Sequence, residues 1–455
     1  MYKRQVRVVY GDGKGTAEIN QDLDWVPGGS EGNDNFGESI DTVDYNEDGC
    51  TDLVVGTPGE NLGEATDAGM FDILYGGTGG LGTGAVKATH YEQGAGNGSL
   101  AASTSETGDR LGHAMAAGVT AAGKPFVVVG APGESVGAST RAGSVYYVHG
   151  GTNVVVHQDK LDVPGAVEAG DRFGTAVAAD ANFIAVGAPG EAIGADDKAG
   201  NLAVFSHALN SENRPAPQFG LDQDLDTVSG GAEAGDEFAA ALALVPYRPS
   251  GASAARESIL VVGSPGEDLT VAGVDKADTG TVYTFRITAS GTYTQLDNYQ
   301  SGPATDDVHG TSEAGDRFGS AITAVNTAPR AVSSAATMKM AVGIPDEAVG
   351  SEAKAGAILT FSLLGAPGAN DRWLEAGDGD GIPGTPKANQ RLGSSVHFTG
   401  TQLYAGMPYG PSSYGALHAL PLSNVTNGAI APVTTYQPGR NGLPAVGVRF
   451  GHAAR

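Results

Sequence analysis

Short blocks of apolar residues alternate along the whole chain with glycine-rich turns, and no block has the length and period of an amphipathic helix. In six places a glycine opens a segment whose side chains alternate in polarity, as in AGSVYYV from residue 142 and AGAILTF from residue 355. A period of two is typical of a half-buried β-strand. The pattern predicts an all-β protein made of many short strands.

Two motifs recur in a fixed order and divide these strands into repeats. The first motif, EAGDRFG, occurs unchanged at 168–174 and 313–319, and related copies begin near residues 31, 106, 233, 388 and 446. Each of the first six copies is followed by an apolar strand and then by a turn of the type GAPGE. These turns begin at residues 56, 130, 187, 263, 343 and 406.

A more polar and variable segment follows each alternating strand, for example VVVHQDKLD from residue 154 and YTQLDNY from residue 293. We expect it to form an outer strand, so that each repeat supplies four antiparallel strands. Such repeats, without linkers between them, are typical of a β-propeller, whose blades pack on their neighbours. An array of β-sandwich domains is the alternative, but it would need separate cores and linkers.

The ends of the chain predict one split blade. RVVYGDG and TAEINQD, within residues 1–25, resemble a third and a fourth strand, whereas residues 446–455 resemble a first strand without a following turn. Six whole repeats, starting near 31, 106, 168, 233, 313 and 388, together with this split blade predict a single seven-bladed propeller domain over residues 1–455. The incomplete blade and the opening residues MYKRQ, which fit no blade strand, suggest a truncated chain.

Phe-Gly in the first motif and Gly-Ala-Pro in the second resemble the FG-GAP repeats of the integrin α-subunit propeller and of its secreted bacterial relatives. The resemblance covers nearly the whole chain, because both motifs recur in order six times. It implies an extracellular calcium-binding module of the adhesion type that binds a protein or a glycan through variable loops. The long inserts at 246–258 and 326–337 are candidates for such loops.

One stretch, DYNEDGCTD at 44–52, carries recognisable metal chemistry. The predicted calcium ligands are Asp44, Asn46, Asp48 and Asp52, at positions 1, 3, 5 and 9 of a loop, and the backbone carbonyl of Cys50 at position 7. Ca²⁺ prefers six to eight oxygen ligands, and glycine at position 6, here Gly49, permits the sharp turn. A strand follows at once in place of the helix of an EF-hand, so the loop resembles the β-hairpin calcium loop of FG-GAP repeats.

The hairpins at the same place in the other repeats lack this spacing, so we expect one calcium ion with a structural role. A second acidic segment, EAGDGDG at 375–381, offers Asp378 and Asp380 but lies outside the expected hairpin, and we interpret it as a loop. In the first motif, Asp171 with Arg172 and Asp316 with Arg317 are expected to form a polar corner between neighbouring blades.

Composition narrows the possible partners. The formal net charge of −26 repels phosphate backbones and anionic membrane surfaces, so nucleic acid is not an expected partner. No apolar run is long enough for a membrane helix, and the first residues lack the apolar stretch of a signal peptide. The single cysteine, Cys50, excludes an intramolecular disulfide. We expect a monomer outside the cell or at its surface.

Catalytic motifs give no positive evidence for an enzyme. GGSEG at 28–32 fits a nucleophile pattern but lies in the loop before Phe36, and the nine histidines include no H-E-x-x-H sequence. The alternative function is a propeller that forms part of a secreted hydrolase, as the relative glycosylphosphatidylinositol-specific phospholipase D suggests. Histidine, arginine and carboxylate groups gathered in the central channel would favour that alternative.

Overall fold

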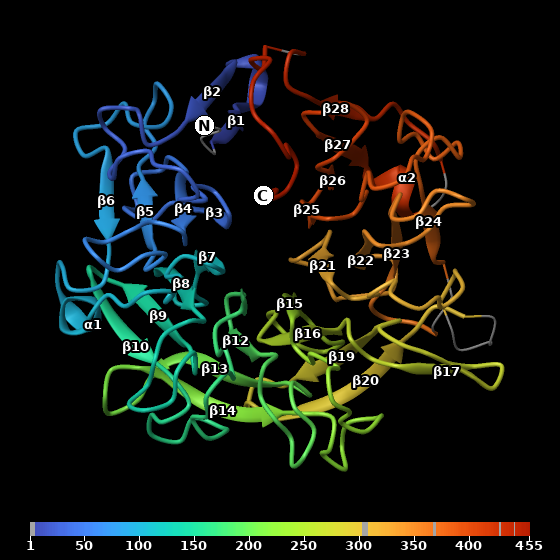
Figure 1. Cartoon of the computed structure of the whole chain (residues 1–455), viewed down its shortest axis with the longest axis horizontal. Coiled ribbons are helices and arrows are strands. Elements are labelled where there is room, and N and C mark those ends of the chain that lie inside the picture. Colours follow the sequence, from blue (N-terminus) through green and yellow to red (C-terminus); the bar gives the residue numbers. More distant parts are fainter. Residues whose placement is uncertain (1–4, 303–307, 367–369, 427–428, 441) are drawn as a thin grey trace. The chain divides into compact units, whose positions relative to one another are not determined.

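The computed structural model describes residues 5–302, 308–366, 370–426, 429–440 and 442–455. Its regular structure is almost entirely β, and the helices are the short segments η1 (Gly11–Gly13), α1 (Gly98–Ala102) and α2 (Leu422–Thr426) (Figure 1). The chain divides into two compact units, residues 1–191 with 201–220, and residues 192–200 with 221–455. Each unit has its own sheets and its own core.

The first unit contains a two-stranded hairpin and three four-stranded antiparallel sheets. The hairpin pairs β1 (Val6–Val9) with β2 (Thr16–Ile19). The sheets comprise β3 (Ile40–Val43), β4 (Asp52–Thr57), β5 (Met70–Leu74) and β6 (Ala88–Tyr91); β7 (Met115–Val119), β8 (Pro125–Ala131), β9 (Ser144–His149) and β10 (Thr152–Val156); and β11 (Ala176–Ala179), β12 (Phe183–Ala188), β13 (Asn201–Leu209) and β14 (Pro215–Leu221). In each sheet every strand pairs with the next one along the chain.

The second unit has the same construction, with three further four-stranded sheets. They comprise β15 (Ala241–Tyr247), β16 (Glu257–Ser264), β19 (Thr281–Ile287) and β20 (Tyr293–Tyr299); β21 (Ala321–Asn326), β22 (Met338–Ile344), β23 (Ala357–Ser362) and β24 (Arg372–Leu374); and β25 (Val396–Phe398), β26 (Gln402–Met407), β27 (Ala416–Pro421) and β28 (Thr434–Tyr436). A small hairpin of β17 (Leu269–Val271) and β18 (Val274–Lys276) is inserted between β16 and β19.

The prediction of four antiparallel strands in each repeat is confirmed, but the prediction of seven blades is wrong, because the described residues form six four-stranded blades. β1 and β2 form only a two-stranded sheet, and residues 446–455 form no strand, only an isolated bridge between Phe450 and Gly415. The reason is that β1 and β2 pair only with each other, while residues 446–455 contribute a turn and no strand that could pair with them. Residues 1–4 of the predicted split blade lie outside the described residues.

The core lies between consecutive sheets and is formed mainly by the second and third strands of each repeat. Every residue of β4 and of β5 is buried, whereas the outer strand β6 is only half-buried. Strands covered on both faces are continuously apolar, which explains why the second strand of each repeat lacks alternation. One cluster joins Val128 and Tyr147 of one sheet to Val186 and Phe205 of the next, with Phe173 of the first motif among them.

The first motif of each repeat joins its sheet to the preceding one through backbone contacts. Phe173 is fully buried, and its N–H donates to the carbonyl of Ala142 at 2.8 Å, beside a parallel bridge to Gly143. Phe238 and Phe318 make the same bond to Ala199 and Thr279, both at distances between 2.8 and 2.9 Å. The aromatic residue therefore sits at the junction between two repeats.

Glycines allow the backbones to approach at this junction. A Cβ on Gly130 would lie 2.0 Å from the carbonyl oxygen of Gly174, far inside van der Waals contact. The corresponding glycine pairs, with distances of 1.9 to 2.1 Å, are Gly56 with Gly112, Gly263 with Gly319, Gly343 with Gly393, and Gly406 with Gly451. The glycine of Gly-Ala-Pro and the glycine of Phe-Gly are thus two halves of one backbone contact.

The acidic residue of the first motif closes its own turn. The carboxylates of Asp109, Asp171, Asp236 and Asp316 each accept the N–H of the residue three positions earlier, at 2.5 to 2.7 Å. Arg317 instead pairs with Glu237 of the preceding repeat at 2.5 Å and with Asp278 at 3.4 Å. The expected polar corner between blades is therefore formed at Arg317 through other acids, while Asp171 and Asp316 stay within their turns.

The second turn departs from its pattern in the fifth repeat. Gly133 donates its N–H to the carbonyl of Asp109 at 3.0 Å, and a Cβ at this glycine would lie 1.7 Å from the Gly108 carbonyl oxygen. In the sequence GIPDE the same position is occupied by Asp346. Its carboxylate lies 3.0 Å from the Arg391 guanidinium of the next repeat and 3.4 Å from the Lys354 ammonium.

The glutamate at the end of the second motif is buried and hydrogen-bonded to a glutamine. Gln21 donates to Glu60 at 2.8 Å, and the same pairing recurs between Gln93 and Glu134, Gln158 and Glu191, and Gln223 and Glu267. Burial raises the pKa of Glu134 and of Glu347 to about 8 and that of Glu60 and of Glu267 to about 7. These carboxyl groups hold their protons near neutral pH.

We expect Gly130→Ala to lower the free energy of unfolding by about 3 kcal/mol, because the new methyl group would overlap the Gly174 carbonyl oxygen. The measurement is chemical denaturation followed by circular dichroism. Gly231→Ala is the matched control, because no atom lies within 4 Å of a Cβ at that exposed position. Equal effects of the two substitutions would show that the close approach is not required.

Stability should fall as the pH rises from about 6.5 to about 8.5, by about 2 kcal/mol for each of Glu134 and Glu347, since both are protonated in the native state and ionised in the unfolded chain. The native state binds more protons in this window, so raising the pH favours unfolding. Urea titrations at several pH values measure the slope. Glu134→Gln should flatten it, whereas Glu64→Gln, at an exposed glutamate that does not act on Glu134, should leave it unchanged.

Candidate metal site

The predicted calcium loop connects β3 to β4 as a hairpin at the edge of the first four-stranded sheet. Val43 pairs with Asp52 at the base of the hairpin, and residues 44–51 form the loop. Glu47 and Gly49 have positive φ angles of 59° and 86°, which produce the tight reversal of the chain. Glycine adopts this conformation without strain, as the loop pattern requires at its sixth position.

The side-chain oxygens of the first three predicted ligands point toward the same short piece of backbone. The two carboxylate oxygens of Asp44 accept the N–H groups of Asp48 at 3.0 Å and Gly49 at 2.9 Å. The Asn46 amide oxygen accepts the same Asp48 N–H at 3.1 Å. The structure therefore brings the side-chain oxygens of Asp44 and Asn46 together around the backbone N–H of Asp48.

Asp48 continues this network. One of its carboxylate oxygens accepts the Cys50 N–H at 2.8 Å, and the other accepts the Asn46 amide at 3.0 Å. The hydrogen bond from the Cys50 backbone, followed by that from Asn46, lowers the pKa of Asp48. The side chain is therefore a carboxylate at neutral pH, which is the form that binds a cation.

Asp52 has a different position from the other predicted ligands, because it is fully buried at the start of β4. One oxygen accepts the N–H groups of Tyr45 at 2.8 Å and Asn46 at 3.4 Å, and the other accepts the Gly76 N–H at 2.8 Å. The Asp52 carboxylate thus accepts hydrogen bonds from the backbone both at the start of the loop and just after the end of β5. This anchoring role was not apparent from the sequence, because Gly76 is 24 residues away.

The donor set fits a hard cation. Asp44, Asn46 and Asp48 offer only oxygen, and Asn46 and Asp48 are exposed, so an ion could reach them from solvent. Cys50 is half-buried, and burial together with the charge of Asp48 raises the pKa of its thiol, which disfavours sulfur ligation. In the described part of the chain no three acidic, histidine or cysteine side chains already surround a common point. The loop therefore has oxygen ligands but no preformed cage.

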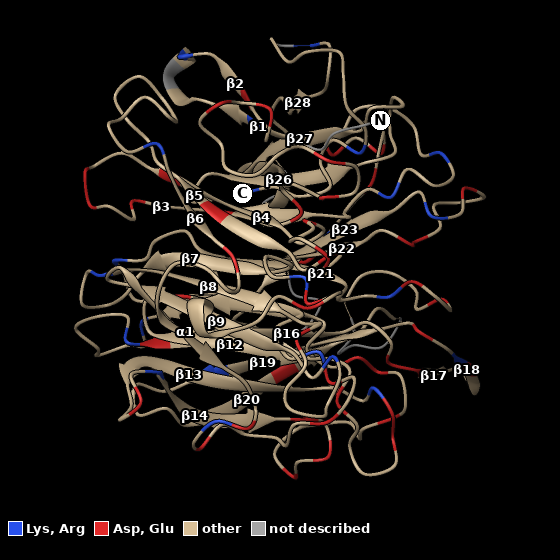
Figure 2. Ribbon diagram, turned by 60° about the vertical axis from the view of Figure 1, so that its left-hand side comes forward, with Lys and Arg blue, Asp and Glu red and all other residues tan. Residues whose placement is uncertain are grey.

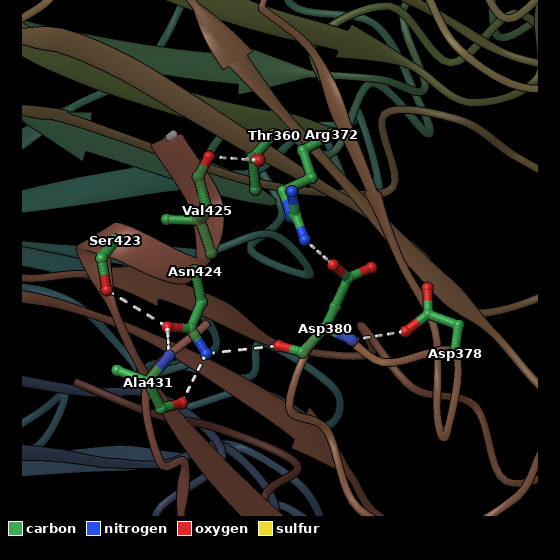
Figure 3. A network of polar contacts seen from close by, with 8 residues as sticks. All are labelled: Thr360, Arg372, Asp378, Asp380, Ser423, Asn424, Val425 and Ala431. Carbon is green, nitrogen blue, oxygen red and sulfur yellow. Dashed lines mark hydrogen bonds and ion pairs between the residues drawn. The ribbon is translucent and has the colours of Figure 1, made fainter. Parts of the chain in front are cut away.

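The second acidic segment is a structural loop, as its sequence position indicated (Figure 3). Asp380 forms an ion pair with Arg372, and its N–H donates to Asp378 at 2.9 Å. Its carbonyl accepts the Asn424 amide at 3.2 Å, and Asn424 also exchanges two hydrogen bonds with the backbone of Ala431. These contacts occupy the carboxylates and tie the loop to α2 through Asn424.

The two inserts of the second unit form one ordered surface, which sequence reasoning did not predict. The Arg248 N–H donates to the Ser333 hydroxyl at 2.9 Å, and the Ser333 N–H donates to the Arg248 carbonyl at 2.8 Å. Asn326 bonds the same hydroxyl at 3.1 Å, and the Arg248 guanidinium donates to the carbonyls of Ala252 and Arg330. Hydrogen bonds thus hold the two loops together, although Arg248 and Ser333 are 85 residues apart in the sequence.

The charge of this surface differs from that of the chain as a whole. Residues 248–256 and 327–337 contain Arg248, Arg256 and Arg330 and no acidic residue, although the chain carries 52 acidic residues and only 26 basic ones. Elsewhere, many acidic residues lie in the loops that connect strands (Figure 2). The signal available in the sequence was that the inserts at 246–258 and 326–337 contain three arginines and only one acidic residue, Glu257.

Two sequence models of the FG-GAP repeat match the chain, one over residues 36–74 and one over residues 158–205. The chain is an FG-GAP repeat protein. Its four-stranded antiparallel sheets are the blades of the propeller fold that these repeats build. The first match begins at Phe36 and spans the whole 44–52 loop, so the predicted metal loop lies inside a recognised repeat.

Comparison with solved structures and with curated proteins gives no further indication of the function. The solved periplasmic gluconolactonase PpgL of Pseudomonas aeruginosa is similar over 85% of this FG-GAP protein and 86% of its own chain, with 13% sequence identity and a TM-score of 0.40. No curated protein matches the sequence. Among the described residues, no helix is long and apolar enough to span a membrane.

Proposed function

We propose that this FG-GAP protein is an extracellular calcium-binding module of the adhesion type, which binds a protein or glycan ligand and uses one calcium ion to stabilise its fold. The observation that carries the proposal is the convergence of Asp44, Asn46 and Asp48 oxygens on one turn, in the spacing of a calcium loop. The proposed location outside the cell is typical of proteins with FG-GAP repeats.

In this proposal, Asp44, Asn46 and Asp48 supply side-chain oxygens and Cys50 supplies its backbone carbonyl. Asp52 completes the set from the ninth position and keeps the loop attached to the end of β5 through Gly76. A bound divalent cation would replace N–H groups as the positive partner of these oxygens and lower the repulsion between the carboxylates. The backbone of the protein holds the loop in the turn that cation binding requires.

The ligand surface that we propose is the pair of inserts at 248–256 and 327–337. Arg256 and Arg330 are exposed there, and the hydrogen bonds between Arg248 and Ser333 hold the two loops in a fixed arrangement. A preorganised loop pair loses less conformational entropy on binding than two free loops. Its three arginines suit an acidic ligand, such as a sulfated glycan or an acidic face of a protein.

About 1 mM Ca²⁺ should stabilise the protein by about 1.4 kcal/mol if the dissociation constant is about 0.1 mM. Differential scanning calorimetry with and without Ca²⁺ measures this difference, and isothermal titration calorimetry gives the stoichiometry. Asp44→Asn should abolish the response, because it removes a carboxylate that faces the loop. Asp378→Asn, in the second acidic loop, should leave the response intact. An unchanged response in the Asp44 variant would exclude this loop as the calcium site.

The insert surface can be tested with a sulfated polysaccharide as the probe. We expect the double variant R256A/R330A to elute from a heparin column at clearly lower salt than the unmodified protein, because two exposed charges of the surface are lost. Lys124→Ala, which removes an exposed cation of the first unit, is the control. Equal losses in the two variants would mean that retention reflects general charge and not the inserts.

A further inference from the structure

The residue before the aromatic position of the first motif has the same unusual backbone conformation in every copy. Its φ angle is positive in each case, between 53° and 61°, and the residues are Asn35, Arg110, Arg172, Glu237, Arg317, Arg391 and Arg449. Equivalent side chains therefore leave the backbone in a similar direction. The ion pair between Glu237 and Arg317, at 2.5 Å, shows that side chains at this position in consecutive repeats reach each other.

In the first unit, consecutive repeats carry arginine at both of these positions, Arg110 and Arg172. Neither has an ion pair within 4 Å in the part of the chain that the structure describes, although Arg317 and Arg391 have acidic partners in the second unit. The Arg110 Nε is buried without a hydrogen-bond partner among the described residues. Neither guanidinium is neutralised by a carboxylate within ion-pair distance among the described residues, so an anion that contacted both would meet two positive charges.

His113 lies beside this pair. The carbonyl of Gly130 accepts the N–H groups of Gly112 at 3.0 Å and of His113 at 3.3 Å, while the Cα of Gly130 faces the Gly174 carbonyl. His113 and the segment that carries Arg172 therefore lie on two sides of one glycine. The His113 Nδ1 is buried and has no hydrogen-bond partner among the described residues.

The electrostatic surroundings of His113 agree with this placement. Burial, followed by the positive charge of Arg110, lowers its pKa to about 4, and Arg172 acts in the same direction. Glu38, which holds the equivalent position in the preceding repeat, offsets part of this effect. The imidazole is therefore neutral at physiological pH and can donate one hydrogen bond without adding a further charge.

We propose that Arg110 and Arg172, together with His113, bind a small oxyanion, a phosphate or a carboxylate group. Guanidinium groups present several N–H donors in a plane and bind such groups through paired hydrogen bonds. The anion would occupy the place that the Glu237 carboxylate takes beside Arg317 in the second unit. Since the chain carries a net charge of −26, an anion is retained only where positive charges are concentrated locally, as they are at Arg110 and Arg172.

The test is a titration with inorganic phosphate and, separately, with acetate, in buffers freed of divalent cations by a chelating resin and held at constant ionic strength with chloride. Calorimetry measures affinity. We expect saturable phosphate binding with one site per chain, weakened at least tenfold in Arg172→Gln. Since Arg172 is exposed, this variant should fold normally, and Arg110→Gln is the second variant.

Arg317→Gln is the matched control, because it removes an arginine from the same repeat position where an acidic partner is already present. It should bind phosphate as tightly as the unmodified protein. Binding of phosphate alone identifies a phosphate site, and binding of both probes identifies a general oxyanion site. No saturable binding of either probe, or equal losses in Arg172→Gln and Arg317→Gln, would overturn the proposal. The absence of Ca²⁺ makes the outcome independent of the calcium loop.

Discussion

The close approach of two glycine backbones, which occurs at five junctions in the described residues, is the constraint on which the architecture depends. A side chain at Gly130 would overlap the Gly174 carbonyl, and the same holds for the corresponding pairs in other repeats. With the backbones this close, the aromatic residue is enclosed and its N–H bonds to the preceding repeat. The motifs persist for this reason, while the connecting loops vary in length and charge without disturbing the junction.

The sequence predicted those features that depend on neighbouring residues. Alternation with period two, the glycine turns and the aromatic position defined four strands in each repeat, and the strands formed as expected. The predicted number of blades was wrong, because a segment with a strand-like sequence joins a sheet only where a neighbouring strand is present to pair with it. Residues 446–455 repeat the Phe-Gly turn, but no apolar strand follows it, and the copy ends in a single bridge at Phe450. The buried Gln93 and Glu134 pair, 41 residues apart, had no local signature.

At the two candidate sites, too, the features set by neighbouring residues could be predicted from the sequence, and the features set by distant residues could not. The oxygens of Asp44, Asn46 and Asp48 are arranged by a turn only a few residues long, so their spacing was readable directly. The anchoring of Asp52 by Gly76 and the mutual support of Arg248 and Ser333 depend on which strands become neighbours. Both inserts were recognised as long loops, but their cooperation could be found only once β15 and β21 had been placed in consecutive sheets of the second unit.

The aspartate in the fifth GxP turn adds ion pairs to a junction that also keeps its glycine contact, between Gly343 and Gly393. At that junction Asp346 pairs with Arg391 of the next repeat and with Lys354 of its own, and its carboxylate is 13% exposed. Contacts between charges weaken as ions accumulate in the medium, whereas the packing of glycine backbones hardly responds. Concentrated salt would therefore weaken the ion pairs of Arg391 and of Arg317 and leave the glycine contacts beside them in place, so the second unit has two contacts between repeats whose strength depends on the medium.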